Sequence, residues 1–326
     1  MKIVKLTFPP ESWDLAKHSP SGTCEWGGYK FLLNQEVEEC DYWLVCGNLV
    51  FDTEKTIVSL ENIVFDTSES ADIVVYNSLF LKQFAYVSSF RTDLMHNNLI
   101  SSEPIIPWFT KKNYDCFSAK SRINKIKKIS LLASDKKASI NHIKRLNFVK
   151  KLKEYFGEEI DFYGAGFTEF ISDKTPTLEP YEFSIILETI TDKDYFSEKL
   201  GDCYLNDSYP IYYGCQNLNQ YFPENSFEQI DINDFEKSVE TIKKIINTEN
   251  YYQQHHDTLL KAKELYLNQY SIFPVMAKIL DKVAEKNINK SISPKKGITL
   301  KKFYIRKGLF YYFRGIRTKI YDLLNL

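Results

Sequence analysis

The sequence YEFSIILETITDKDYFSEKLGDCYLNDSYPIYYG, residues 181–214, decides the fold of this 326-residue chain. Residues 183–187 are a short apolar run that is typical of a buried strand, and residues 210–213 are a second one. Between them, Ser197 is a favourable N-cap for a helix that begins at Glu198. We therefore predict a strand, a helix of about three turns and a second strand, with the two strands parallel.

Four polar or aromatic side chains fall at the carboxyl end of this predicted unit, where parallel strands bind their ligands. They are Glu188 after the first strand, Tyr195 in the loop, and Glu198 and Lys199 in the first helical turn. A carboxylate can accept hydrogen bonds from ribose hydroxyls, and a cation can neutralise a phosphate, so the junction suits a nucleotide. The alternative is an ordinary solvated pair of charges at the start of a surface helix.

The whole stretch resembles the donor-binding signature of the GT10 fucosyltransferases, approximately Y-K-F, F-E-N, Y-[VIF]-T-E-K-[IL] and P-[IV]-x-x-G. The residues that match it in order and spacing are Tyr181, Phe183, Glu188, Tyr195, Glu198, Lys199, Leu200, Pro210, Ile211 and Gly214. The chain departs from the signature at Thr189, where the family has Asn, and at Ser197, which replaces Thr and keeps the hydroxyl.

A second match to the family lies upstream of this stretch. Arg145, followed by Phe148 and Leu152, resembles the pattern R-x-x-F-x-x-x-L, in which the arginine reaches the donor pyrophosphate. A planar guanidinium suits that task because it can hold phosphate oxygens bidentately. The neighbouring Lys144 and His142 either assist or belong to a solvated helix face.

A third match concerns an acid near the N-terminus. Glu69 follows a predicted strand in the sequence Thr67-Ser68-Glu69, which is similar to a T-G-E context with Ser in place of Gly. In the bacterial fucosyltransferases a glutamate at such a place is catalytic, so the resemblance implies that Glu69 is the general base. The alternative is a loop residue that caps a turn or lies on the surface.

The length of the chain is sufficient for two domains. We expect an α/β domain at residues 1–112, a basic linker at 113–128, a second α/β domain at 129–289 and a basic tail at 290–326. The predicted strands are residues 2–8, 42–46, 57–60, 63–66, 129–132 and 161–163, and the predicted helices are 140–156, 234–247 and 259–286. The resemblance implies a GT-B-type fold, in which two Rossmann-like domains face each other across a cleft and the second binds the nucleotide sugar.

The composition of the chain argues against nucleic acid as a partner and favours a reducing compartment. The net charge of −1 gives no overall field for nucleic acid, and we interpret the basic residues 109–128 as a linker rather than a nucleic-acid site. The six cysteines form no C-x-x-C pair, which favours a reducing, cytoplasmic compartment. We expect no signal peptide and no transmembrane helix, since no apolar run reaches membrane-spanning length, and the sequence contains no P-loop motif.

The sequence also contains a motif that we expect to be misleading. Asp192-Lys193-Asp194 spells D-x-D, a metal–diphosphate motif of a different glycosyltransferase architecture. Here it lies inside a signature whose family does not need a metal for its chemistry. We therefore expect no metal site and no cofactor apart from the donor substrate GDP-fucose.

The tail at residues 290–326 has an unusual charge. It holds ten basic residues and one acid, so it carries +9 while residues 1–289 carry −10. Its aromatic residues and a helical face containing Leu309, Phe313 and Ile316 favour an amphipathic helix on an anionic membrane surface. The alternative is a helix that docks on the acidic body of the protein itself.

Taken with the resemblance, these features predict an inverting glycosyltransferase of α-1,3-fucosyltransferase type. It would move fucose from GDP-fucose to a glycan, such as an N-acetylglucosamine or glucose unit of a bacterial surface polysaccharide, free or lipid-linked. Lipopolysaccharide biosynthesis and protein glycosylation are the expected processes, at the inner face of the cytoplasmic membrane. The alternatives are another nucleotide sugar as donor, or a non-catalytic membrane-associated relative that binds glycan or nucleotide.

Overall fold

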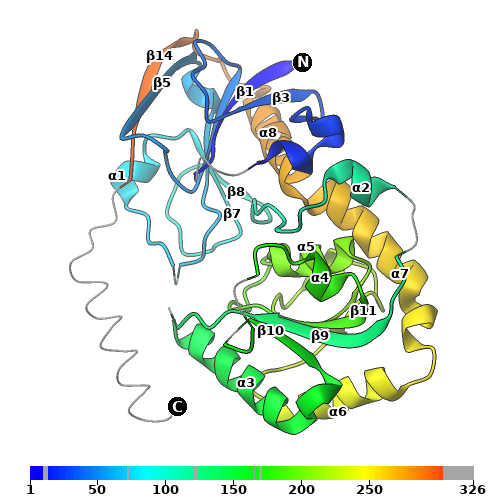
Figure 1. Cartoon of the computed structure of the whole chain (residues 1–326). Helices are drawn as coiled ribbons and strands as arrows, with labels where there is room; N and C mark the ends of the chain where they lie inside the picture. Colours follow the sequence, from blue (N-terminus) through cyan, green and yellow to red (C-terminus); the bar gives the residue numbers. More distant parts are fainter. Residues whose placement is uncertain are drawn as a thin grey trace. The chain divides into compact units, whose positions relative to one another are not determined.

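The chain forms two compact units in the computed structural model (Figure 1). The structure describes residues 1–9, 14–71, 73–119, 123–137, 139–164, 166–168 and 171–303. The first unit comprises Met1–Pro107, Lys112–Cys116 and the described residues from 268 to 303. The second unit comprises Trp108–Lys111 and Phe117–Leu267.

A seven-stranded sheet forms the centre of the first unit, with the strand order β2-β3-β1-β4-β6-β7-β8. Its strands are β1 (Lys2–Thr7), β2 (Glu25–Trp26), β3 (Tyr29–Leu33), β4 (Tyr42–Cys46), β6 (Ile63–Asp66), β7 (Tyr86–Ser89) and β8 (Leu99–Ser101). All neighbours are parallel except β2 and β3. The bounds predicted for β4 and β6 are confirmed, and β1 ends one residue earlier than predicted.

The predicted strand at residues 57–60 is wrong in its bounds. Strand β5 (Thr53–Val58) lies outside the large sheet and pairs antiparallel with β14 (Lys296–Lys301). Residues 60–62 form a short 3-10 helix instead. Only alternate side chains of β5 face the core, because it belongs to a two-stranded ribbon with one exposed face.

The late part of the chain completes the first unit, which differs from the expected domain bounds of 129–289 and 290–326. Helix α8 (Ile272–Asn287) buries Phe273, Met276 and Leu280 in one core with residues of β1, β3 and β4. Figure 1 shows α8 and β14 in orange among the blue strands. Apolar packing therefore takes residues 268–303 away from the second unit.

The second unit contains a five-stranded parallel sheet with the order β10-β9-β11-β12-β13. Its strands are β9 (Lys127–Ala133), β10 (Asp161–Gly164), β11 (Tyr181–Leu187), β12 (Tyr209–Tyr213) and β13 (Glu228–Gln229). The predicted parallel pairing of the two strands in residues 181–214 is confirmed. The four strands that were predicted are each one to three residues longer than their predicted runs, because flanking residues such as Lys127 and Tyr181 also join the ladder, and β13 was not predicted.

Helices surround this sheet. They are α3 (Ile140–Phe156), α4 (Thr175–Leu178), α5 (Glu198–Leu205), α6 (Phe235–Asn247) and α7 (Tyr251–Leu265). The bounds predicted for α3 are confirmed, and α5 begins at Glu198 as predicted, with the Ser197 hydroxyl accepting from the Lys199 amide. Helix α5 has eight residues rather than three turns, because Asn206 ends it.

The helix predicted at residues 259–286 is interrupted. Helix α7 ends at Leu265, a π-helical turn covers Tyr266–Tyr270, and α8 starts after Ser271. Pro274 lacks a backbone N–H and therefore suits the first turn of a new helix rather than the middle of an old one.

Short elements complete the described chain. They are the 3-10 helices η1 (Ala16–His18), η2 (Pro20–Gly22), η3 (Leu60–Asn62), η4 (Gly157–Glu159) and η5 (Leu218–Gln220), and the helices α1 (Ser78–Leu81) and α2 (Tyr114–Ser118). No helix in the described ranges combines the length and the apolarity that crossing a bilayer requires. The amphipathic helix predicted within residues 304–326 lies outside the described residues.

Candidate functional site

The centre of the candidate site is Glu188, directly after β11. Its carboxylate is buried and accepts hydrogen bonds from the Ser197 amide at 2.8 Å and the Ser197 hydroxyl at 2.7 Å. The Lys199 ammonium lies 3.1 Å from its second oxygen. The carboxyl end of β11 and the first turn of α5 are thus joined through one buried carboxylate.

A second carboxylate on α5 extends this cluster. Glu198 forms ion pairs with Lys174 at 3.2 Å and with Lys199 at 3.8 Å. Lys174 also contacts Asp202 at 2.8 Å, and Asp202 accepts the Phe109 amide at 2.9 Å. Sequence reasoning missed Lys174 and Asp202, although Asp202 lies one helical turn after Glu198 and therefore on the same face.

Burial and the neighbouring lysines shift the pKa values of these carboxyl groups in opposite directions. Burial alone would raise the pKa of Glu198, but the ammonium groups of Lys199 and Lys174 outweigh it and lower the pKa to about 2. Burial raises the pKa of Asp202, and Lys174 only partly offsets this. The Lys174 pKa is raised, since its two carboxylate partners overcome its own burial. Glu198 is therefore an ionised acceptor over the physiological range.

Arg145 lies on α3 with its side chain almost fully buried. One terminal nitrogen donates to the Ser134 hydroxyl at 2.8 Å, whereas Nε has no hydrogen-bond partner among the described residues. Burial lowers the pKa of the guanidinium, and the nearby carboxylates of Glu188 and Glu198 oppose that shift. Phe148 and Leu152, the other residues of the matched pattern, are buried on the same helix.

A buried cation with an unpaired N–H is costly unless a partner completes it, because its hydration has been lost. An anion of the ligand would supply that partner. Arg145 and Lys199 therefore provide two positive groups near one strand-to-helix junction, with Glu188 and Glu198 between them as hydrogen-bond acceptors.

Two glycines make room for this arrangement. A Cβ at Gly214 would lie 2.6 Å from Cγ of Glu188, and one at Gly201 would lie 2.0 Å from the ring of Tyr266. Tyr195, the aromatic residue of the predicted site, is buried at 8% exposure after the loop. The glycine that ends the matched signature is thus required by close packing on the candidate site.

The D-x-D motif takes part in loop structure. The Asp194 carboxylate accepts hydrogen bonds from the Asn217 side chain at 2.7 Å and from the Tyr221 hydroxyl at 2.5 Å. Asp194 itself has a left-handed backbone, with φ at 62°. Its carboxylate thus holds the loop after β11 against the segment after β12. No group of three or more metal-ligating side chains is found among the described residues.

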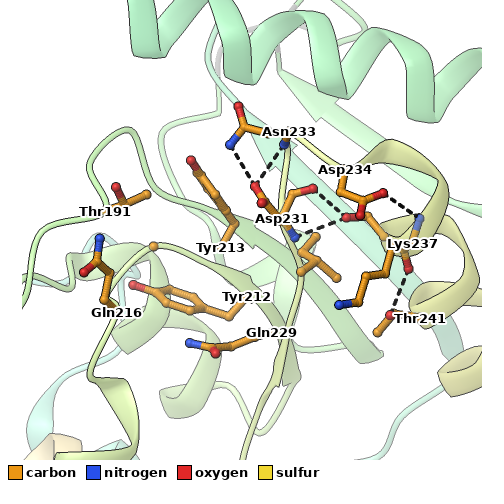
Figure 2. Close-up of a pocket in the computed structure, with 13 residues that line it drawn as sticks. Thr191, Tyr212, Tyr213, Gln216, Gln229, Asp231, Asn233, Asp234, Lys237 and Thr241 are labelled. Atoms are coloured by element: carbon orange, nitrogen blue, oxygen red, sulfur yellow. Dashed lines mark hydrogen bonds between the residues drawn. The ribbon is translucent and has the colours of Figure 1, made fainter.

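A polar pocket of about 520 Å³ borders the cluster (Figure 2). It lies beyond the carboxyl ends of β12 and β13, at the start of α6, and Tyr212 and Gly214 form part of its wall. Its acids are engaged locally: Asp231 accepts from Asn233 at 2.8 Å, and Asp234 caps α6 by accepting from the Lys237 amide. The pocket is an open polar extension of the site rather than its buried centre.

The predicted base, Glu69, belongs to the first unit. It is exposed in the loop that follows β6, and its carbonyl accepts a hydrogen bond from Arg91 at 3.2 Å. The structure joins Glu188, Glu198 and Lys199 in one cluster, with Arg145 near its two carboxylates. Tyr195 belongs to the same unit, and Glu69 belongs to the other one.

Comparison with known proteins identifies the family. The profile described as "Glycosyltransferase family 10 (fucosyltransferase) C-term" matches residues 123–295, more than half of the chain. The 4-galactosyl-N-acetylglucosaminide 3-alpha-L-fucosyltransferase 9 of Mus musculus is 36% identical over 89 residues, and that of Homo sapiens 35%. These alignments cover 26% of the chain and 24% of each relative, so the chain spans about a quarter of the length of the curated relatives it matches.

Solved structures show the same fold. An alpha1,3-fucosyltransferase with GDP-fucose has a TM-score of 0.51 at 17% identity, over 90% of this chain and 92% of that one. An alpha-glucosyltransferase with UDP and a mismatch-containing DNA has a TM-score of 0.50 at 10% identity, over 86% and 99%. The predicted GT-B-type class is confirmed, and the chain belongs to glycosyltransferase family 10, the fucosyltransferase family.

Proposed function

We propose that the second unit binds GDP-fucose and that the protein transfers fucose from it to a hydroxyl of a glycan. The observation that carries this proposal is the buried guanidinium of Arg145, whose Nε is unpaired beside two carboxylates. A diphosphate would complete Arg145 and pair with Lys199, while Glu198 would accept hydrogen bonds from the ribose hydroxyls. Tyr195 would pack near the nucleotide.

The proposed reaction needs two kinds of assistance: stabilisation of the leaving group GDP and a base for the acceptor hydroxyl. GDP leaves as the bond between the fucose C1 and the phosphate oxygen breaks, and two cations stabilise the charge that develops on it. Glu69 removes the proton of the acceptor hydroxyl as its oxygen bonds to C1. Attack from the face opposite the diphosphate inverts the anomeric centre. No divalent metal is required in this scheme.

For the acceptor we propose an α-1,3 linkage to an N-acetylglucosamine or glucose unit of a bacterial surface polysaccharide, free or lipid-linked. The names of the fucosyltransferase relatives support the linkage. The basic residues 290–326 support work at the inner face of the cytoplasmic membrane, as in lipopolysaccharide biosynthesis. Another nucleotide sugar is the alternative donor, since a structural neighbour was solved with UDP and Thr189 departs from the signature.

A thermal-shift panel tests the donor. We expect GDP and GDP-fucose to raise the unfolding temperature and UDP-sugars to leave it unchanged, because a ligand at about 100 times its Kd stabilises the folded state by about 2.7 kcal/mol. Stabilisation by a UDP-sugar instead would assign a different donor. No response to any nucleotide would favour a relative that has lost donor binding.

Substitutions test the site. Arg145→Ala and Lys199→Ala should each weaken GDP binding about ten-fold or more, since each removes a charge-assisted contact. Lys237→Ala is the matched control, because it removes an exposed lysine of the adjoining pocket without touching the cluster. Isothermal titration calorimetry measures all three. An equal loss of GDP affinity in the control would assign the donor site to the pocket instead.

A further inference from the structure

Three side chains hold the backbone of residues 67–69 in the first unit. The Tyr76 hydroxyl donates to the Thr67 carbonyl at 2.9 Å. The Asp66 carboxylate accepts from the Ser68 amide at 3.0 Å and from the Ser68 hydroxyl at 2.8 Å. A terminal nitrogen of Arg91 donates to the Glu69 carbonyl at 3.2 Å. Three consecutive residues are therefore anchored, one by each side chain.

The middle residue of this turn has an unfavourable backbone. Ser68 has φ at 52°, in the left-handed region that glycine adopts freely and that residues with a Cβ avoid. The two hydrogen bonds to Asp66 close a local turn that holds Ser68 in this conformation. Since Asp66 is buried at the end of β6, the turn is attached to the sheet itself.

Arg91 is equally well fixed. Its Nε and Nη2 donate to the two carboxylate oxygens of Asp93 at 2.8 and 2.7 Å, and Nη1 also donates to the Val74 carbonyl at 2.7 Å. The guanidinium lies 5.8 Å from the ring centroid of Tyr76. A buried, fully oriented guanidinium thus spans two carbonyls of the loop that carries Glu69.

We infer that Asp66 and Arg91 are positioning residues for the Glu69 carboxylate. The inference rests on the proposed function, in which Glu69 is the base. An exposed base on a loop must be held within a fraction of an ångström of its working place, and displacement by about 1 Å is costly in rate. Fixing the backbone on both sides of the Glu69 Cα limits its carboxylate to positions that the side-chain torsions can reach.

The test is a set of substitutions assayed by GDP release from GDP-fucose, with a 4-galactosyl-N-acetylglucosaminide oligosaccharide or water as acceptor. Asp66→Ala should lower kcat about ten-fold and leave KM for GDP-fucose unchanged, because the donor site belongs to the other unit. Asp66→Asn keeps an acceptor oxygen and should retain kcat. Arg91→Lys, which cannot span both carbonyls in the same geometry, should behave like Asp66→Ala.

A second substitution separates positioning from general damage. Ser68→Gly removes the backbone strain, so it should restore most of the kcat lost in Asp66→Ala. Thr56→Val is the matched control, since its buried hydroxyl donates to the Val37 carbonyl at 2.7 Å in the same unit and bonds neither Asp66 nor Arg91. A drop in kcat for the control equal to that of Asp66→Ala, or no restoration by glycine, would overturn the inference.

Glu69→Gln distinguishes this inference from the function on which it rests. Loss of turnover in Glu69→Gln together with wild-type kcat in Asp66→Ala and Arg91→Lys would refute positioning and leave the base in place. Wild-type turnover in Glu69→Gln would refute the base assignment and the inference with it.

Discussion

Asp66 combines burial with ionisation near neutral pH. Loss of hydration raises its pKa to about 7, and the hydrogen bonds from Ser68 and Ser88 offset only part of that shift. A carboxyl group whose pKa is higher in the folded protein than in the unfolded chain binds its proton more tightly when folded. Its contribution to stability is therefore greatest at acidic pH and decreases as the pH rises from about 4 to about 7.

Asp66→Asn tests this at single-residue resolution. The amide resembles the protonated acid and cannot ionise, so the variant should match the wild type at about pH 4 and exceed it at about pH 8. The difference in unfolding free energy should approach about 4 kcal/mol, at about 1.4 kcal/mol for each pKa unit. Urea unfolding at the two pH values measures it. A difference that does not change with pH would show that Asp66 is not the titrating group.

The sequence reveals some residues of the donor cluster and conceals others. Glu188, Glu198 and Lys199 can be found because they stand at fixed offsets around one strand-to-helix junction. Lys174 comes from the loop before α4, and only the folded chain brings its ammonium to Glu198 and Asp202. An ion pair between separate elements leaves no periodic signal, so sequence reasoning could not have found Lys174.

Helix α5 depends on a contact that only one residue type permits. Gly201 lies where Tyr266 approaches the helix, and a Cβ there would be 2.2 Å from the tyrosine oxygen. The helix accepts glycine despite its low propensity because no larger residue fits.

Gly201→Ala should therefore destabilise the second unit by about 1–3 kcal/mol, even though alanine is the better helix former. Adding Tyr266→Leu, which removes the ring, should recover part of that loss. Thermal unfolding of the single and double variants measures both effects. An alanine variant as stable as the wild type would show that Tyr266 can move aside at no cost.

At the scale of elements, sequence prediction worked where one pattern determines one element. The apolar runs of β4 and β6 and the helix α3 were predicted with the observed bounds. Strand β5 was misplaced because its partner, β14, lies more than two hundred residues later in the chain. The local pattern of apolar residues cannot predict which distant strand pairs with β5, because tertiary structure determines that pairing.

For the molecule as a whole, β14 offers a way to test whether the two units are independent. Leu300 is buried at 2% exposure, and Thr299 beside it on the same strand is exposed. Leu300→Ala should destabilise the first unit by about 3 kcal/mol and leave the affinity for GDP unchanged. Thr299→Ala is the control and should change neither quantity.

Denaturant unfolding measures the stability of each variant, and titration of the folded variants with GDP measures their affinity for it. A loss of GDP affinity that parallels the loss of stability in Leu300→Ala would contradict the independence of the units. Since no local pattern places residues 268–303 with the first unit, their assignment could not have been predicted from the sequence.

That assignment has a consequence for how the protein is made. The ribosome synthesises the chain from its N-terminus, so the strands of the seven-stranded sheet are translated long before α8 and β14. Helix α8 packs in the core of that sheet, and β14 pairs with β5. Apolar residues such as Phe31 and Leu44 lack their core partners Phe273 and Met276 until the entire second unit has been translated. During this interval the second unit can already fold, whereas the first can only be completed after α8 and β14 have been translated.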